Sequence, residues 1–215
     1  MPAMDFKNIR VNDDDINTAI DGIITSYQQN DQPLPQNEAQ INVNISYEVS
    51  YEYLLDYAKS IVDSNFTDQG LIVLAHAVYG WMPTILTIQH GINPTVDLTR
   101  IKEILREIYH NPEYNFLNDA NGLKDIANFT NKSFVGASKF LHFLFPNSFA
   151  IWDSNINSIL QIRKTANNVN AFVIYQRAMK SALSALREIQ MRICLRDIEK
   201  KLFDIGRQDR NHNDN

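Results

Sequence analysis

Apolar residues recur every three or four positions along most of this 215-residue chain, and this spacing constrains its fold more than any other feature. One face of an α-helix presents residues at this spacing, whereas a strand alternates at every second residue. No stretch of strand length alternates convincingly, and glycine is scarce at seven residues. The pattern therefore predicts an all-α fold, specifically an orthogonal helical bundle with a helix-hairpin-helix-like element.

The same spacing, with capping residues and breakers, places the individual elements. Residues 29–44 are polar, contain two prolines and have no period, so we expect a long loop there. We expect one α-helical domain over residues 1–215, with 208–215 as a disordered tail. The predicted helices cover residues 12–28, 46–63, 68–89 (kinked or split at Pro83), 97–110, 122–129, 138–145, 153–162, 168–188 and 190–206, with a tight turn at 130–137.

Composition excludes several classes of protein. No apolar run approaches the roughly 18 residues that span a bilayer, and the first residues lack a signal-peptide pattern, so we expect a cytoplasmic protein without a membrane partner. The single Cys194 cannot form an internal disulfide and fits a small apolar residue. The histidines are scattered without metal-ligand spacing, and no phosphate-binding glycine loop occurs. We therefore expect no metal and no cofactor. The oligomeric state stays open.

Charge is unevenly distributed along the chain. The net charge is -5, but residues 1–66 carry -8 and residues 163–207 carry +6. A basic C-terminal face could contact a phosphate backbone while the acidic remainder stays solvated. Equally, the two ends could pack near each other and neutralise. Composition does not choose between these interpretations.

The segment from residue 123 to residue 160 is the one that carries candidate chemistry. It contains two short predicted helices joined by a turn with Gly136, an outline in which backbone N–H groups at a helix start can bind a phosphate. A lone glycine turn between helices is also common in proteins that bind no DNA. The predicted DNA contacts of this turn are Gly136, Ala137, Ser138 and Lys132.

Two side chains in this segment suit base excision. Lys139 falls in the first turn of the predicted helix after the hairpin, where N-terminal dipoles favour a neutral, nucleophilic amine. Asp153 lies fourteen residues later, where a carboxylate could stabilise a developing sugar cation. The alternatives are an exposed first-turn lysine and an ordinary helix N-cap.

These residues resemble the motif of the helix-hairpin-helix DNA glycosylase superfamily. The matching stretches are residues 135–139 (Val-Gly-Ala-Ser-Lys), the apolar residues 140–145 and residues 150–153 (Ala-Ile-Trp-Asp), roughly a fifth of the chain. A shorter form of the motif, with Ser-Lys, an apolar helix, Pro and Trp-Asp-Ser, also resembles uncharacterised bacterial proteins. The resemblance implies an all-α DNA-binding enzyme in which Lys139 attacks C1′ and Asp153 assists departure of the base.

Aromatic residues supply a candidate base pocket. Tyr79 and Trp81 flank Gly80 in the most apolar predicted helix, and flat rings suit a base flipped out of the duplex. Trp152 precedes the candidate carboxylate, and His142 lies three residues after Lys139. Each of these residues would also fit a packed core.

The sequence therefore supports two hypotheses of different classes. The first is a DNA glycosylase, with or without AP-lyase activity, that removes a damaged or modified base in DNA repair or in antiviral defence against foreign DNA. The second is a non-catalytic nucleic-acid-binding or protein-interaction module of helix-hairpin-helix type. In the second, Lys139 would be a phosphate contact and Asp153 a helix cap.

Overall fold

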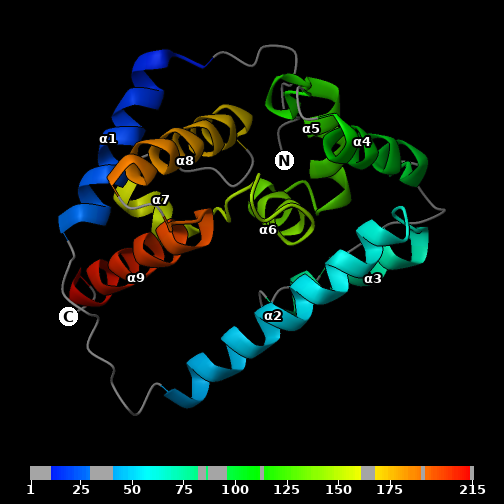
Figure 1. Ribbon diagram of the computed structural model, residues 1–215, viewed down its shortest axis with the longest axis horizontal. Helices are drawn as coiled ribbons and strands as arrows, with labels where there is room; N and C mark the ends of the chain where they lie inside the picture. Colours follow the sequence, from blue (N-terminus) through cyan, green and yellow to red (C-terminus); the bar gives the residue numbers. More distant parts are fainter. Residues whose placement is uncertain are drawn as a thin grey trace. The chain divides into compact units, whose positions relative to one another are not determined.

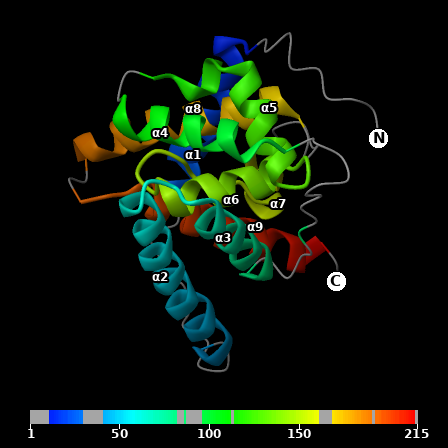
Figure 2. The ribbon, with the colours of Figure 1, turned by 90° about the vertical axis from the view of Figure 1, so that its right-hand side faces the viewer.

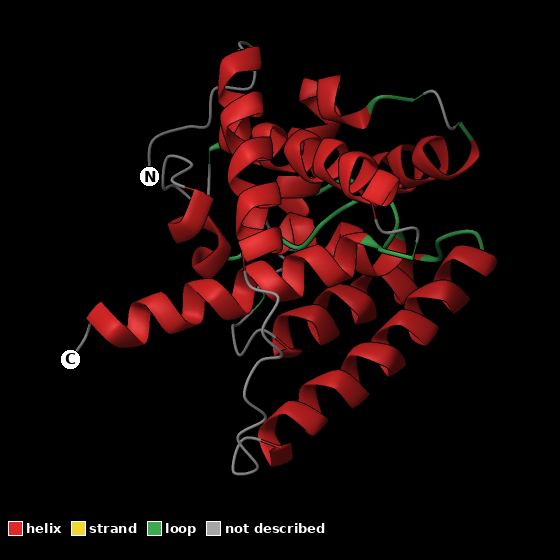
Figure 3. Ribbon diagram, turned by 60° about the vertical axis from the view of Figure 1, so that its left-hand side comes forward, coloured by secondary structure: helices red, strands yellow, loops and turns green. Residues whose placement is uncertain are grey.

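Every regular element in the described part of the protein is helical (Figures 1 and 3). The computed structural model describes residues 11–29, 41–81, 86, 96–111, 114–160, 168–189 and 192–213. The predicted all-α fold is thus confirmed. The elements are α1 (Asp13–Gln29), α2 (Ile41–Asp63), α3 (Asp68–Trp81), α4 (Leu98–His110), η2 (Phe116–Asn118), α5 (Ala120–Phe129), α6 (Phe134–Leu144), α7 (Ser154–Leu160), α8 (Val169–Ile189) and α9 (Leu195–Asn213).

The chain divides into two compact units. Unit 1 combines Met1–Gln32 with Phe145–Asn215, and unit 2 is Pro33–Leu144. The segment that carries the candidate chemistry crosses this boundary, because α6 ends unit 2 and α7 belongs to unit 1. Lys139 and Asp153 are therefore described in separate surroundings.

In unit 1, α1 packs along α8, and α7 packs along α9. Ile23 of α1, Val173 and Met179 of α8 and Ile198 of α9 are completely buried. Gly206 of α9 lies directly against the backbone carbonyl of Asn155, so that a Cβ at this position would fall within 3.0 Å of that oxygen. This close approach seats the first turn of α7 on α9.

In unit 2, α2, α3 and α6 pack against one another, and α5 joins α4 to α6 (Figure 2). The helix faces that meet are apolar and fully buried. Burial of this kind contributes roughly 25 cal/mol per Å² of apolar surface. The buried set includes Ala58, Leu71, Leu74, Val78, Leu105, Ala127, Phe134, Phe140 and Leu141.

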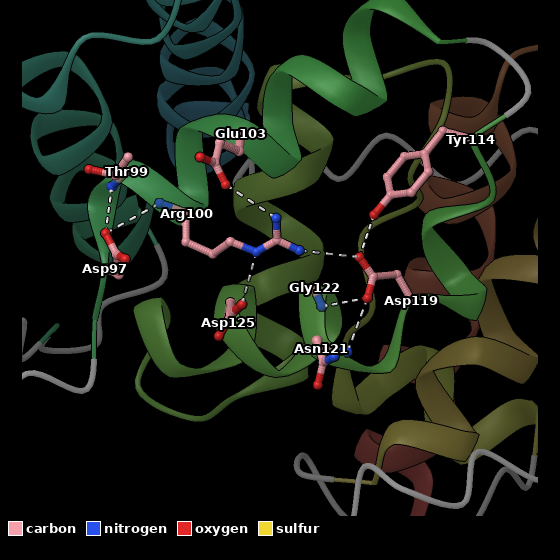
Figure 4. A network of polar contacts seen from close by, with 9 residues as sticks. All are labelled: Asp97, Thr99, Arg100, Glu103, Tyr114, Asp119, Asn121, Gly122 and Asp125. Carbon is pink, nitrogen blue, oxygen red and sulfur yellow. Dashed lines mark hydrogen bonds and ion pairs between the residues drawn. The ribbon is translucent and has the colours of Figure 1, made fainter.

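A charged network on the surface of unit 2 holds α4 to α5 (Figure 4). Arg100 of α4 lies 3.6 Å from Asp125 and 4.0 Å from Asp119. Asp119 also caps α5, accepting hydrogen bonds from the N–H groups of Asn121 and Gly122, and it accepts the hydroxyl of Tyr114. Although burial alone would raise it, these hydrogen bonds and Arg100 hold the pKa of Asp119 below its usual value. The network is fully explained by capping and helix pairing.

Several predicted boundaries need correction. The loop expected over 29–44 is too long, because α2 begins at Ile41; residues 30–40 lie outside the described part. The tail expected over 208–215 is instead helical as far as Asn213. The predicted kink at Pro83 also lies outside the described residues. The turn after α5 spans only residues 130–133, and α6 begins four residues earlier than predicted.

Candidate functional site

The turn between α5 and α6 forms without a glycine. Asn131 and Lys132 both adopt left-handed backbone conformations, with φ of 53° and 55°. The N–H of Lys132 donates to the carbonyl of Ala127 at 2.7 Å, which is the long hydrogen bond of a Schellman C-cap. Ser133 then caps α6, its hydroxyl accepting the N–H of Gly136 at 3.2 Å. One helix therefore ends and the next begins within four residues.

Gly136 is not the turn residue that we predicted. It lies in the first turn of α6, and a Cβ there would fall within 3.0 Å of both Oη and Cζ of Tyr79. The Tyr79 hydroxyl donates to the carbonyl of Thr130 at 2.7 Å, which fixes the ring against the turn. A glycine is needed at position 136 because the Tyr79 ring of α3 packs directly against the backbone of α6 there.

The predicted DNA contacts differ in accessibility. Ala137 and Ser138 are 1% and 0% exposed, and the Ser138 hydroxyl donates to the carbonyl of Val135. Gly136 is buried as well, whereas Lys132 is exposed in the turn. Only Lys132 therefore offers its side chain to solvent as a phosphate contact.

Lys139 lies in a different electrostatic setting from the one we predicted. It is the sixth residue of α6, beyond the first turn in which the helix dipole acts, so the dipole argument for its activation is wrong. Instead the residue is only 8% exposed, and its Nζ lies 5.8 Å from the centroid of the Trp81 ring. Burial against an aromatic ring, rather than a helix terminus, defines the surroundings of this amine.

An aromatic cluster extends from Trp81. The ring of Phe143 meets Trp81 edge to face at 5.5 Å, and Tyr51 lies 6.4 Å from Trp81. The Tyr51 hydroxyl and Nε2 of His142 are hydrogen-bonded at 2.7 Å, and both residues are buried. Unit 2 thus brings together Lys139, Trp81 and His142, three of the predicted site residues, and adds Tyr51.

Tyr51 was missed because no local pattern marks it. It lies on α2, 91 residues before His142, in a run that contains three other tyrosines (47, 53 and 57). Only the packing of α2 on α6 selects it. Among the described residues, no group of three His, Cys, Asp or Glu side chains could hold a metal ion.

Asp153 caps α7 in unit 1. Its Oδ1 accepts the N–H of Asn155 at 2.8 Å, and its carbonyl accepts the N–H of Asn157 at 3.0 Å. The side chain is partly exposed. The predicted cap is therefore present, and its carboxylate has a fixed orientation.

Trp152 is a core residue of unit 1. It is 1% exposed and stacks on Tyr175 with ring centroids 6.2 Å apart, with Phe172 nearby at 6.3 Å. Because these rings and the surrounding core cover it, we assign Trp152 to the core rather than to a base pocket. By the same measure Tyr79 and His142, 3% and 0% exposed, belong to the core of unit 2, and Trp81 is the predicted pocket residue that is partly exposed.

No family match was found. The sequence matches no protein-family model, and comparison with curated proteins and with solved structures likewise returned no match. The site is therefore argued from its own geometry and chemistry. In the described part of the chain, none of the helices combines the length and the apolar character needed to cross a membrane.

Tyr79 provides a pH-dependent test of this geometry. Burial raises its pKa from 10.0 to about 12. Folding favours the protonated phenol. The contribution of Tyr79 to the stability of unit 2 is therefore complete below pH 10, and it is lost as pH rises toward 12 because the unfolded chain loses the proton first. We expect the free energy of unfolding to fall less steeply across that range in Tyr79→Phe than in wild type, as measured by urea denaturation. Equal slopes would contradict the assignment, since the other tyrosines are common to both proteins.

Proposed function

We propose that this chain is a DNA base-excision enzyme, a DNA glycosylase with or without an AP-lyase step, in which Lys139 is the nucleophile. The observation that carries the proposal is the burial of Lys139, 8% exposed, with its Nζ beside the Trp81 ring. Lysine is rarely buried to this extent. Once deprotonated, a lysine amine is a strong nucleophile toward the C1′ carbon of a sugar.

The aromatic cluster supports a nucleobase as the substrate group. Trp81 is partly exposed and its ring lies 5.8 Å from the amine, with Tyr51 packed beside it, and base-excising enzymes hold an extruded base by stacking. Lys132, exposed in the left-handed turn, suits a phosphate contact that fixes the register of the DNA. The resemblance to helix-hairpin-helix glycosylases over the motif residues agrees with this proposal.

The proposed chemistry follows from an amine and a glycosidic bond. The neutral Lys139 amine attacks C1′, the C1′–N bond breaks, and its electron pair leaves with the base, which takes up a proton. The attacking nitrogen gives up the proton that the base takes, and opening of the sugar ring at C1′–O4′, with O4′ taking a proton from water, then gives the protonated imine. Asp153, assigned by its sequence motif, would stabilise positive charge on the sugar and assist proton transfer.

Borohydride trapping tests the nucleophile. We expect wild-type protein to form a covalent adduct with duplexes that carry abasic sites, because borohydride reduces the imine to a stable amine. Lys139→Met keeps the apolar stem of the side chain and removes the amine, so no adduct should form. Lys124→Met, which removes an exposed lysine of α5, is the matched control and should trap as wild type does. Trapping that survives in Lys139→Met would eliminate Lys139 as the nucleophile.

Release of modified bases tests the carboxylate. Asn is as good an N-cap as Asp, so Asp153→Asn removes the charge while keeping the cap of α7. We expect this change to slow base release by about 10²- to 10⁴-fold. Base release that needs Asp153 but survives Lys139→Met would indicate a monofunctional glycosylase.

One observation favours the non-catalytic alternative: the Asp153 carboxylate already serves as a helix cap. Under that alternative the chain would bind nucleic acid without reacting. No adduct and no base release from a panel of modified duplexes, together with binding that weakens steeply with salt, would support the alternative.

A further inference from the structure

The second half of the link between α6 and α7, residues 149–152, runs through the core of unit 1 rather than over its surface. Phe149, Ala150, Ile151 and Trp152 are 2%, 0%, 5% and 1% exposed. Connecting segments usually remain at the surface, because a buried, non-helical backbone must find hydrogen-bond partners. Here every polar backbone group of Ala150 and Ile151 has such a partner.

Those partners are side chains of α8 and α9. Gln176 accepts the N–H of Ala150 at 2.9 Å and donates to its carbonyl at 2.7 Å. Tyr175 donates to the carbonyl of Ile151 at 2.6 Å, and Glu199 accepts the N–H of Ile151 at 2.7 Å. We call these three side chains the clamp. They replace the neighbouring strand or helical turn that would otherwise satisfy this backbone.

The clamp is a costly way to connect two helices. Gln176 is 1% exposed and Glu199 is 2% exposed, and a buried carboxylate carries a large desolvation penalty. Arg196, paired with the other oxygen of Glu199, offsets part of it. A solvent-exposed loop would connect α6 to α7 without burying any charge.

What the clamp holds is the backbone that leads directly into Asp153. Trp152 stacks on Tyr175, a member of the clamp, and the next residue places its carboxylate on the N–H of Asn155. The carboxylate is close enough to Tyr175 that it contributes, after burial and Glu199, to raising the pKa of that phenol. Asp153 is partly exposed, although it directly follows the buried residues 149–152, of which 150 and 151 are held by the clamp.

We infer that Gln176, Tyr175 and Glu199 are positioning residues that fix the Asp153 carboxylate for base release, an inference that rests on the proposed function. Catalytic groups work when the packing and hydrogen bonds behind them hold their geometry to a fraction of an ångström. The clamp supplies such support without touching the substrate. Steps that need only Lys139 should not depend on it.

The test separates these steps. Gln176→Met keeps the length of the side chain but removes both hydrogen bonds to Ala150, whereas Met179→Ala destabilises α8 from a buried position with no bond to the segment. We expect Gln176→Met to lower kcat for base release by about a hundredfold with KM unchanged, while adduct formation on abasic DNA stays at the wild-type rate. Met179→Ala, which leaves the hydrogen bonds of the clamp in place, should lower base release far less than Gln176→Met does. Glu199→Gln, which keeps an oxygen for the N–H of Ile151, should retain most of the base release.

Two outcomes would overturn the inference: base release unchanged in Gln176→Met, or base release falling as far in Met179→Ala as in Gln176→Met. Failure of the proposed function looks different, because wild-type protein would then neither release bases nor form an adduct. In that case amide hydrogen exchange tests whether the clamp still fixes the backbone around Asp153. The quantity to compare is the exchange rate of the Asn155 amide divided by that of the Ala178 amide. The inference requires this ratio to be higher in Gln176→Met than in Met179→Ala, and equal ratios would refute it.

Discussion

Gly136→Ala should destabilise unit 2 by about 1 to 3 kcal/mol, the usual range for an added methyl group in a packed core. The new Cβ would fall within 3.0 Å of the Tyr79 ring, and the ring cannot move away freely because it is 3% exposed and bonded to Thr130. Denaturant unfolding followed by the fluorescence of Trp81, in a Trp152→Phe background, would report on unit 2 alone. The chain has only two tryptophans, one in each unit.

Gly80→Ala is the matched control for this change. Gly80 also lies within a helix of unit 2, but a Cβ there meets nothing within 4 Å. Alanine is a better helix former than glycine, so this variant should lose no stability. Adding Tyr79→Phe to Gly136→Ala removes Oη, one of the clashing atoms, and should recover part of the loss. A loss that Tyr79→Phe leaves unchanged would show that the ring is not its cause.

Glu199→Ala should destabilise unit 1 by about 1 to 3 kcal/mol, because it leaves the buried N–H of Ile151 without its acceptor. The change removes the carboxylate that meets both Arg196 and the N–H of Ile151. Unfolding followed by Trp152 fluorescence in a Trp81→Phe background measures it. Trp152 is well placed for this purpose, since it follows the clamped residues directly.

Glu188→Ala controls for the general effect of losing a carboxylate. Glu188 is exposed near the end of α8, and substitutions at such positions usually change stability by less than about 0.5 kcal/mol. If Glu199→Ala were as mild as Glu188→Ala, the carboxylate of Glu199 would not be the group that holds residues 150 and 151. The clamp would then depend on Gln176 and Tyr175 alone.

Local signals predicted the helices well. The periodic apolar residues of α4, with Asp97 as its N-cap, act within a few residues and can be read directly from the sequence. The start of α6 was misplaced because we took Gly136 to mark the turn. The actual signal was Asn131, which tolerates a left-handed conformation, followed by Ser133 as an N-cap. A left-handed lysine at position 132 has no comparable signature.

The surroundings of the candidate site could not be predicted in this way. Lys139 and His142 were recognised from their spacing, but their burial and the bond from His142 to Tyr51 depend on how α2 packs against α6. The clamp is similarly non-local, because Glu199 lies 48 residues after Ile151. Hydrophobic periodicity indicates which face of a helix is buried, not which partner buries it.

Unit 1 is built from two separate stretches of chain, and this has a consequence for synthesis on the ribosome. α1 is made early, but α8, along which it packs, begins only at Val169, about 140 residues after α1 ends. At about 5 to 20 residues per second, α1 waits roughly 7 to 28 seconds for its partner, with its apolar face uncovered by α8. All of unit 2 is synthesised during this interval. Codon changes that slow translation between α6 and α8 should therefore lower the yield of unit 1, while unit 2, whose residues all precede them, is unaffected.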